Sequence, residues 1–391
     1  LTNLRVLYLG HTAVTLKAVE SLEKKLPNLR VLSYEPWQPV NGPFADFGQV
    51  IISGQQTVSG VLQPLVTAGK AGNIREVRIR GVKLAAGDVA QIVQLPALKR
   101  LGLHDIKLST DRLEPLVGAA GLEELDLIES PLVSGDVAPI SKLAKLRRLR
   151  LRCIQIEDAG VEHLRSLTEL ERLDLSGTQI TDHALSIVSR FPRLEDLYLY
   201  DTKVAGDGLR EVGKLAHLKK LGLPMGLFGT DFQHLRKLTS LEEIYLNQVV
   251  GTDEAVASLA NCVKLKTLNL AFSDLSDVGM KTVAGFHALT YIMLARTKVT
   301  DNGLAALKQL SNLECIDASE TSIGDDGLAH LKKLDKLNLL LLCRTRVTAA
   351  GLVHLRGLRS LRTLQVPYRC GDGVHTALLR KELPDLSLNF D

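Results

Sequence analysis

Residues capable of catalysis or metal binding are scattered through this sequence of 391 residues. The five cysteines stand singly, at Cys153, Cys262, Cys315, Cys343 and Cys370. The chain contains no HxxxH or CxxC pair for a metal, no phosphate-binding loop and no nucleophile elbow. A reactive thiol needs a neighbouring base that lowers its pKa, and the sequence identifies no such partner. We therefore predict no catalytic residue, no metal site and no cofactor, and we expect that the protein is not an enzyme.

The composition bears on compartment and partner. An odd, dispersed set of cysteines indicates reduced thiols and favours a cytoplasmic protein. The net charge is +4, from 48 basic and 44 acidic residues, which is too balanced for the positive face that nucleic-acid binding usually needs. No stretch approaches the roughly 18 consecutive apolar residues of a membrane-spanning helix. We therefore expect no nucleic-acid partner and no membrane span.

The chain is built from a repeated unit, which is clearest from residue 170 to 191, LERLDLSGTQITDHALSIVSRF. In its first half Leu173 and Leu175 alternate with polar residues, which predicts a short strand. In its second half apolar residues recur every three positions from Leu185, which predicts a short helical turn. One unit is too small to bury its own apolar side chains, so neighbouring units must stack.

Two polar positions of the unit have expected structural roles. A hydroxyl residue followed by aspartate, as in Thr181-Asp182, predicts a helix N-cap whose carboxylate favours the positive end of the helix. The same pair recurs as Ser276-Asp277 and Thr300-Asp301. At the ninth position, a hydroxyl is expected to satisfy the backbone of the loop in five repeats, at Thr178, Thr202, Thr297, Thr321 and Thr345.

The unit recurs at intervals of 24 residues, with a single interval of 23. Clear copies begin at Ile74, Leu98, Leu122, Leu146, Leu170, Leu194, Leu218, Leu241, Leu265, Leu289, Leu313, Leu337 and Leu361. The form LxxLxLxxTxITDxGLxxLxxL, nearly whole from residue 289 to 310, resembles the short intracellular-type and bacterial members of the leucine-rich repeat family. The resemblance implies an α/β solenoid, a right-handed horseshoe with a parallel β-sheet on its concave face and short helices on its convex face.

A solenoid grows along one axis, so residues 1–391 are expected to form a single leucine-rich repeat domain of about 16 repeats. Irregular repeats are expected at 29–73 and 218–240, and a C-terminal cap at 367–391. The first repeat has nothing before it to cover its apolar end. We therefore expect either a docked partner or a preceding segment there.

The irregular N-terminal stretch contains the only tryptophan. Three prolines fall within residues 36–43, which predicts an extended loop in place of a helix. Trp37 could be a binding anchor, or it could fill the gap left by the missing helix.

Positions 3, 5, 7 and 8 of each repeat are expected to face the concave side, which solenoids use for binding. Six of the seven tyrosines stand at these positions, namely Tyr8, Tyr198, Tyr200, Tyr245, Tyr291 and Tyr368. The candidate hot spot for a partner comprises Tyr198, Tyr200, Tyr245, Phe272, Tyr291 and Met293. Rigid amphipathic rings give much contact area for little entropic cost. The alternative is that tyrosine simply favours strands.

A second candidate patch precedes the tyrosines and is rich in arginine. Its candidate binding residues are Arg78, Arg80, Arg148, Arg150 and Arg152. The intervening repeat carries Glu124 and Asp126, so the charges could merely neutralise one another along the sheet. Recognition of a charged partner is the equal alternative, because three arginines on one strand exceed what two carboxylates can pair.

These patterns predict a protein–protein interaction module that holds a protein or peptide on its concave face. The alternative is a substrate-recognition adaptor that delivers its cargo to an enzyme on another domain or subunit. That alternative is what a distant resemblance to F-box substrate adaptors, whose repeats are similar but longer, and to bacterial effector proteins implies.

Overall fold

The computed structural model describes residues 6–8, 30–32, 49–54, 56–67, 71–107, 113–371 and 373–391. Trp37 and the proline-rich segment around it lie outside the described residues. Among the described residues, no helix combines the length and the apolar character needed to cross a membrane.

The LxxLxL half of each repeat forms a strand, and the strands join in one open, fifteen-stranded parallel sheet in chain order from β3 to β17. The strands are β3 Gln49–Ser53, β4 Glu76–Arg80, β5 Arg100–His104, β6 Glu124–Ile128, β7 Arg148–Arg152, β8 Arg172–Asp174, β9 Asp196–Tyr198, β10 Lys220–Gly222, β11 Glu243–Tyr245, β12 Thr267–Asn269, β13 Tyr291–Met293, β14 Cys315–Asp317, β15 Leu339–Leu341, β16 Thr363–Val366 and β17 Ser387–Phe390. A separate pair, β1 Val6–Tyr8 and β2 Arg30–Leu32, is also parallel.

The second half of each repeat forms a short α-helix, a 3₁₀ helix or both. The α-helices are α2 Val58–Thr67, α3 Asp88–Val93, α4 Asp158–Glu162, α5 Asp182–Val188, α6 Gly208–Val212, α7 Thr252–Ser258, α8 Asp277–Val283, α9 Asp301–Leu304, α10 Asp325–Leu328 and α11 Val374–Glu382. The 3₁₀ helices are η1 Ala71–Asn73, η2 Glu114–Gly118, η3 Ser134–Lys142, η4 His163–Ser166, η5 Gly229–Leu235, η6 Ala305–Gln309, η7 Ala349–Leu355 and η8 Tyr368–Cys370.

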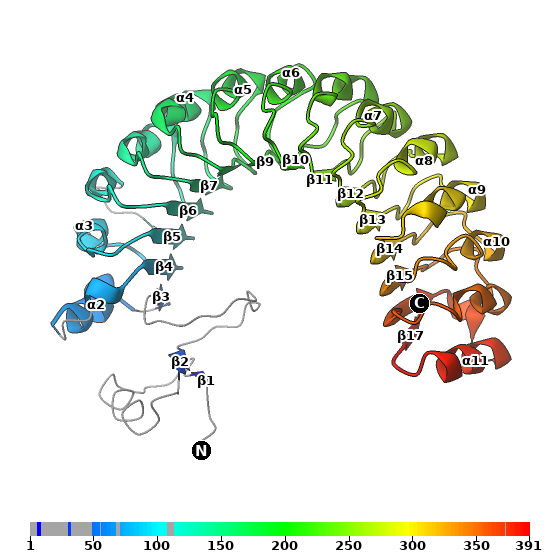
Figure 1. Cartoon of the computed structure of the whole chain (residues 1–391). Helices are drawn as coiled ribbons and strands as arrows, with labels where there is room; N and C mark the ends of the chain where they lie inside the picture. The colour runs from blue at the N-terminus through cyan, green and yellow to red at the C-terminus, as the bar shows by residue number, and fades with distance from the viewer. Residues whose placement is uncertain are drawn as a thin grey trace.

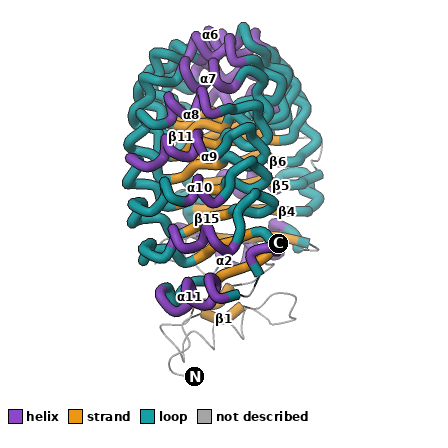
Figure 2. The backbone as a smooth tube through the Cα atoms, turned by 90° about the vertical axis from the view of Figure 1, so that its right-hand side faces the viewer, coloured by secondary structure: helices purple, strands orange, loops and turns teal. Residues whose placement is uncertain are grey.

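The repeats are arranged as a horseshoe, which confirms the predicted fold class. The strands line the inner curve and the helices lie on the outer curve (Figure 1). The view turned by 90° shows the strands as successive rungs of the same sheet (Figure 2). Because each strand pairs in the same register as the last, equal positions of consecutive repeats stand side by side, as Leu173, Leu197 and Leu221 do.

The core is a stack of leucine layers between sheet and helices. Leu173 and Leu175 are fully buried, as the alternation predicts, and the helix adds Leu185 and Val188 to the same layer. Since each layer is covered only by its two neighbours, removing apolar volume from one layer weakens the contact to both.

Hydrogen bonds between repeats fix where each helix begins. The predicted N-caps are confirmed: the Thr300 hydroxyl accepts from the Asn302 N–H at 3.3 Å, and Thr181 and Ser276 cap in the same way. Asp277 also bonds to the following repeat. Its carboxylate accepts from the Thr300 N–H at 2.8 Å and from the Thr300 hydroxyl at 2.6 Å, one repeat later.

The hydroxyl at the ninth position bonds to its own loop, as predicted. Thr297 donates to the carbonyl of Leu294 at 2.7 Å, and the four other threonines donate to the carbonyl three residues earlier, with Ser273 doing the same. These bonds satisfy a buried carbonyl at the bend between strand and loop.

The shortened repeat at 218–240 keeps the sheet intact. β10 stays in register with β9 and β11, and Leu227 takes the buried place in the loop that isoleucine or valine has in other repeats. At the C-terminal end β17 pairs with β16, and Leu388 and Phe390 pack against the last core layer. Residues 367–391 thus contain the helix α11 and the strand β17.

Candidate functional site

Three tyrosines form a contiguous aromatic cluster on the concave face, defined here as Tyr198, Tyr200 and Tyr245. The ring centroids of Tyr198 and Tyr200 are 6.1 Å apart, with the planes inclined by 33°. Tyr200 and Tyr245 are 6.2 Å apart in an edge-to-face arrangement at 79°. Both geometries are favourable for aromatic pairs. The cluster therefore presents one connected surface across β9–β11.

Gly222, which the sequence analysis did not single out, makes the cluster possible. The register places Gly222 between Tyr198 on β9 and Tyr245 on β11. A Cβ atom on Gly222 would lie 2.4 Å from Cζ of Tyr200. The ring of Tyr200 therefore lies over the backbone of β10, in the space that a side chain would take. The sequence signal that could have identified Gly222 is a single concave-facing glycine between two strands that carry tyrosine.

The three rings are half-buried, and this environment affects their hydroxyls. Burial raises the pKa of Tyr198 to about 12, and burial is also the main cause that raises the pKa of Tyr200 and of Tyr245. Within the described structure none of the three hydroxyls makes a hydrogen bond to another residue. The hydroxyls thus remain neutral at physiological pH and are free to bond to a partner.

Arg172 joins the aromatic cluster to the charged part of the face. Its guanidinium carbon lies 6.0 Å from the ring centroid of Tyr198. The same side chain forms an ion pair with Asp196, with Nε at 2.8 Å from Oδ2. The distance to the ring is at the limit for a cation–π contact, so the carboxylate is the stronger partner of Arg172.

The arginine patch, defined as Arg78, Arg80, Arg148, Arg150 and Arg152, lies on β4 and β7. Its carboxylate partners are few. Glu76, nearly buried, pairs with Arg78 at 2.5 Å and with Arg100 at 2.9 Å.

On β7 the two carboxylates of β6 are shared between two arginines. Arg150 lies 3.2 Å from Asp126, and Arg148 lies 3.5 Å from Glu124. Arg152, like Arg80 on β4, makes no ion pair among the described residues. The expected excess of arginine over carboxylate is therefore present, and it resides at the ends of the two strands.

Two groups beside this patch, the half-buried His104 and the buried Asp126, have strongly shifted pKa values. Burial lowers the pKa of His104 to about 4, helped by the nearby Arg78 and Arg150 guanidinium groups. Burial raises the pKa of Asp126 to about 6, against the opposing effect of Arg150. His104 Nε2 and Asp126 Oδ1 are buried atoms without a hydrogen-bond partner in the described structure. Such groups are costly unless a ligand or water satisfies them.

The remaining predicted hot-spot residues are separated from the aromatic cluster. Tyr291 and Met293 lie on β13, two strands beyond Tyr245, with Thr267 and Asn269 of β12 between them. Phe272 is not on the sheet face. It follows β12 at the rim, half exposed, with the guanidinium of Arg296 5.0 Å from its ring centroid.

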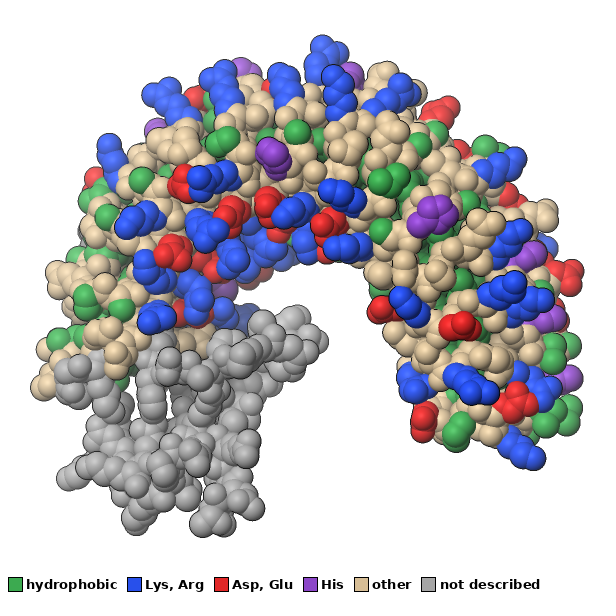
Figure 3. Space-filling model, viewed as in Figure 1, with side chains coloured by type: hydrophobic (Ala, Val, Ile, Leu, Met, Phe, Trp, Pro, Cys, Tyr) green, Lys and Arg blue, Asp and Glu red, His purple; other side chains and the backbone are tan. Residues whose placement is uncertain are grey.

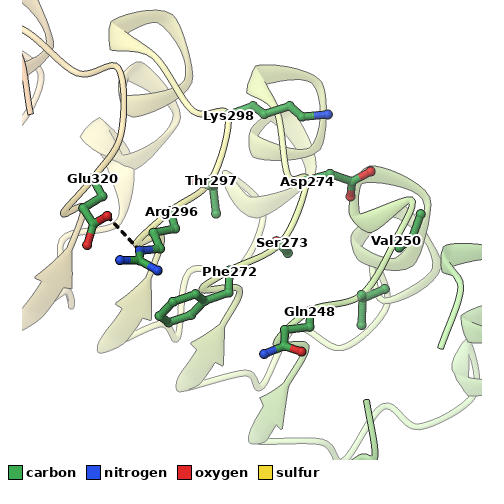
Figure 4. Close-up of a pocket in the computed structure, with 10 residues that line it drawn as sticks. Gln248, Val250, Phe272, Ser273, Asp274, Arg296, Thr297, Lys298 and Glu320 are labelled. Carbon is green, nitrogen blue, oxygen red and sulfur yellow. Dashed lines mark hydrogen bonds and ion pairs between the residues drawn. The ribbon is translucent and has the colours of Figure 1, made fainter. Parts of the chain in front are cut away.

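Phe272 and Arg296 line an open groove of about 530 Å³ along the rim (Figure 4). Arg296 is held between the Phe272 ring and Glu320, whose carboxylate is 2.8 Å away. Val250 on the opposite wall of the groove is exposed. The rim therefore offers apolar surface beside a guanidinium that is already paired.

Most residues at the eighth position share one unusual backbone conformation. Phe272 has a φ of 59° and Arg296 a φ of 55°, and the same left-handed region holds Asp105, Glu129, Cys153, Asp201, Gln248, Glu320 and Arg344. This conformation costs roughly 1–2 kcal/mol for a residue other than glycine. Since the turn after each strand imposes it, the side chains at this position line the rim in a row.

A further apolar area, not predicted from the sequence, lies on the same sheet. Leu339 and Leu341 of β15 are only half-buried, and the register places them beside Cys315 and Asp317 of β14. Their signal was the unbroken run of leucines, which hides the alternation of a strand. No group of three or more His, Cys, Asp or Glu side chains in the described structure is arranged to hold a metal ion.

Comparisons with known proteins agree with this architecture. A model of the leucine-rich repeat matches residues 261–284. An internalin from Listeria monocytogenes has a TM-score of 0.65 and 23% identity, covering 85% of this chain and 93% of the other. A leucine-rich repeat protein of Leptospira interrogans has a TM-score of 0.58 and 19% identity, covering 100% and 90%. The mouse RP105/MD-1 complex has a TM-score of 0.55 and 18% identity, covering 92% and 61%.

A search of curated protein sequences found no match. At these identities the solved structures establish the fold alone. The match at 261–284, the recurrence of its pattern every 24 residues and the open parallel solenoid agree with one another. The chain thus has the leucine-rich repeat fold, and its residues 261–284 match a leucine-rich repeat.

Proposed function

We propose that the protein is a non-enzymatic interaction module that binds a protein or peptide partner on its concave face. The observation that carries the proposal is the aromatic cluster of Tyr198, Tyr200 and Tyr245. Three touching rings, half exposed on an otherwise open sheet, have a cost in solubility that a monomeric protein rarely bears without a use. Aromatic rings of this kind are the usual anchors of protein interfaces.

The arginine patch supports the same proposal, because it can orient the bound partner. Arg80 and Arg152 have no ion-pair partner in the described structure, so a ligand carboxylate would not have to displace one. Fork-shaped guanidinium groups bind carboxylates through two hydrogen bonds. We therefore assign anchoring to the aromatic cluster and orientation to the arginine patch.

The test compares variants of the full chain in affinity capture from the native source, followed by mass spectrometry. Tyr200→Ala is expected to weaken capture of a specific partner at least tenfold, because it removes the central ring. The control is Tyr368→Ala, since Tyr368 is 80% exposed and lies outside the cluster. Circular dichroism is expected to show the same melting profile for both variants. Equal capture by wild type and Tyr200→Ala would refute the proposal.

The same experiment separates the module from the adaptor alternative. Capture of a partner together with an enzyme would favour an adaptor that delivers cargo, provided that the amounts of both captured proteins fall in parallel when Tyr200 is replaced. A partner captured without any enzyme favours the simple interaction module.

A further inference from the structure

Charge is segregated along the concave face. At positions 3, 5 and 7, strands β4–β8 carry charged residues at most places, whereas β12–β16 carry a single charge, Asp317. The space-filling view shows charged side chains crowded along the inner curve from the N-terminal arm to the top of the arch, and fewer along the inner edge of the C-terminal arm (Figure 3). The two halves of the face therefore offer different chemistry to one ligand.

From this segregation we propose that the bound segment is acidic at one end and aromatic or aliphatic at the other. It lies across the strands, with its acidic end over β4–β7 and its apolar end over β13–β15. This inference rests on the proposed function, and it adds the chemistry and the direction of the partner.

The acidic end is inferred from cations that the protein leaves available. The register places Arg80 beside His104, and Ile128 beside Arg152, so one row at the strand ends contains both unpaired arginines. Asp105 and Glu129, which directly follow His104 and Ile128 in the chain, form no ion pair with these arginines in the described structure. A carboxylate of the ligand would fill this row without competition.

The environment of His104 agrees with this assignment. Burial is the main cause that lowers the pKa of His104, and the nearby Arg78, Arg150 and Arg80 guanidinium groups lower it further. These same positive charges would attract an anion bound beside them.

The apolar end is inferred from side chains that the sheet leaves uncovered. Met293, Leu339 and Leu341 are half-buried on the face, on strands two apart. The one carboxylate among them, Asp317, already accepts a hydrogen bond from the Ser319 N–H at 3.0 Å. An aromatic or aliphatic residue of the ligand can therefore pack on Met293, Leu339 and Leu341, while the Asp317 carboxylate keeps its hydrogen bond from the Ser319 N–H.

The aromatic cluster lies between these two ends and makes the surface continuous. From β6 to β14 the face extends roughly 40 Å at about 4.8 Å per strand. An extended peptide advances about 3.3 Å per residue, so roughly 12 residues span that distance. One segment of this length can reach all three areas together.

The probe is a phage-displayed library of random peptides about 16 residues long, long enough to span the face, selected on the full chain. Selected peptides are expected to carry Asp and Glu in one half and aromatic or aliphatic residues in the other. A synthetic copy of the most enriched peptide then receives a photoreactive group at either end. The acidic end is expected to cross-link within residues 76–152 and the apolar end within residues 291–343.

Charge reversal tests the acidic end directly. The double variant Arg80→Glu with Arg152→Glu is expected to weaken binding of that peptide at least tenfold in fluorescence anisotropy. The matched control is Lys332→Glu with Lys333→Glu, which reverses two exposed charges on the helical side of the repeat. The control is expected to bind as wild type does.

Several results would overturn the inference: selected peptides with no charge asymmetry, cross-links in the opposite direction, unchanged affinity after reversal of Arg80 and Arg152, or tighter binding of single-stranded RNA of equal length. If the selected peptides lack an acidic end but bind the Tyr200→Ala variant more weakly than the wild type, the further inference is refuted and the proposed function stands. Peptides whose binding is indifferent to Tyr200 would refute the proposed function as well.

Discussion

The ring of Tyr200 lies directly over the Cα atom of Gly222, on the neighbouring strand of the concave sheet. A methyl group at Gly222 would occupy the position of the ring, with 2.4 Å between the new Cβ and Cζ of Tyr200. The aromatic cluster thus depends on the absence of a side chain one strand away. This relationship leads to a test that needs no partner.

Gly222→Ala is expected to push the Tyr200 ring into solvent and to lower the pKa of that tyrosine towards its ordinary value. Burial raises the tyrosine pKa values in the wild type, with Tyr198 at about 12 against an ordinary 10.0. Tyrosinate absorbance during an alkaline titration measures the change. More tyrosine should ionise between pH 10 and 12 in the variant. Gly135→Ala, where a Cβ meets open space, should titrate as wild type, and an unchanged curve for Gly222→Ala would contradict the packing described.

The bond from Thr300 to Asp277 links one repeat to the next, so its loss should appear in stability. Asp277→Ala removes the acceptor of two hydrogen bonds, at 2.8 and 2.6 Å. We expect the free energy of unfolding to fall by about 2–4 kcal/mol, since bonds to charged groups are worth about 1.5–3 kcal/mol each. Urea denaturation measures it. The control, Asp335→Ala, changes an exposed aspartate on the surface, and an equal loss in both variants would be inconsistent with a specific link.

Leu175 tests the stacking of layers. Its side chain is fully buried, and Leu175→Ala is expected to cost about 2–5 kcal/mol through lost burial and the cavity that remains. Hydrogen exchange should increase in the repeats on both sides, because each layer is supported by its neighbours. A melting profile equal to that of the wild type would argue against the layered core.

His104 and Asp126 should affect stability in opposite directions over the same pH range. The pKa of Asp126 is raised from 3.8 to about 6, so its stabilising contribution is present below pH 3.8 and is lost as the pH rises through 6. The pKa of His104 is lowered from 6.5 to about 4, so its contribution is present above pH 6.5 and is lost as the pH falls towards 4. The two effects oppose each other in the wild type.

Single variants separate the two contributions. In His104→Gln, acidification from pH 7 to 4 should raise the free energy of unfolding by roughly 2 kcal/mol relative to the wild type, because the opposing contribution of His104 is gone. In Asp126→Asn the same acidification should lower it, because only His104 remains. Urea denaturation at several pH values measures both. Parallel pH profiles for the two variants would show that the assignment of the shifts to these residues is wrong.

The sequence by itself determined the architecture. The alternation around Leu173 and Leu175, the recurrence every 24 residues and the Thr-Asp pairs each specify local structure, and each copy repeats the same local interactions. Parallel strands in the same register place equal repeat positions side by side. The residues on the concave face could therefore be identified by counting positions within each repeat. The positions of Tyr198, Tyr245, Arg150 and the other concave residues on the strands were therefore predictable.

Only the tertiary structure decided how those side chains use the face. Three features depend on side-chain rotamers between strands that are more than 20 residues apart in the chain. These are the packing of Tyr200 over Gly222, the ion pair of Arg150 with Asp126 and the lack of an ion pair at Arg152 in the described structure. The turn that sends Phe272 to the rim depends on a left-handed backbone that its side chain does not favour. Local sequence patterns fix which way a residue faces, whereas contacts across strands fix what it meets there.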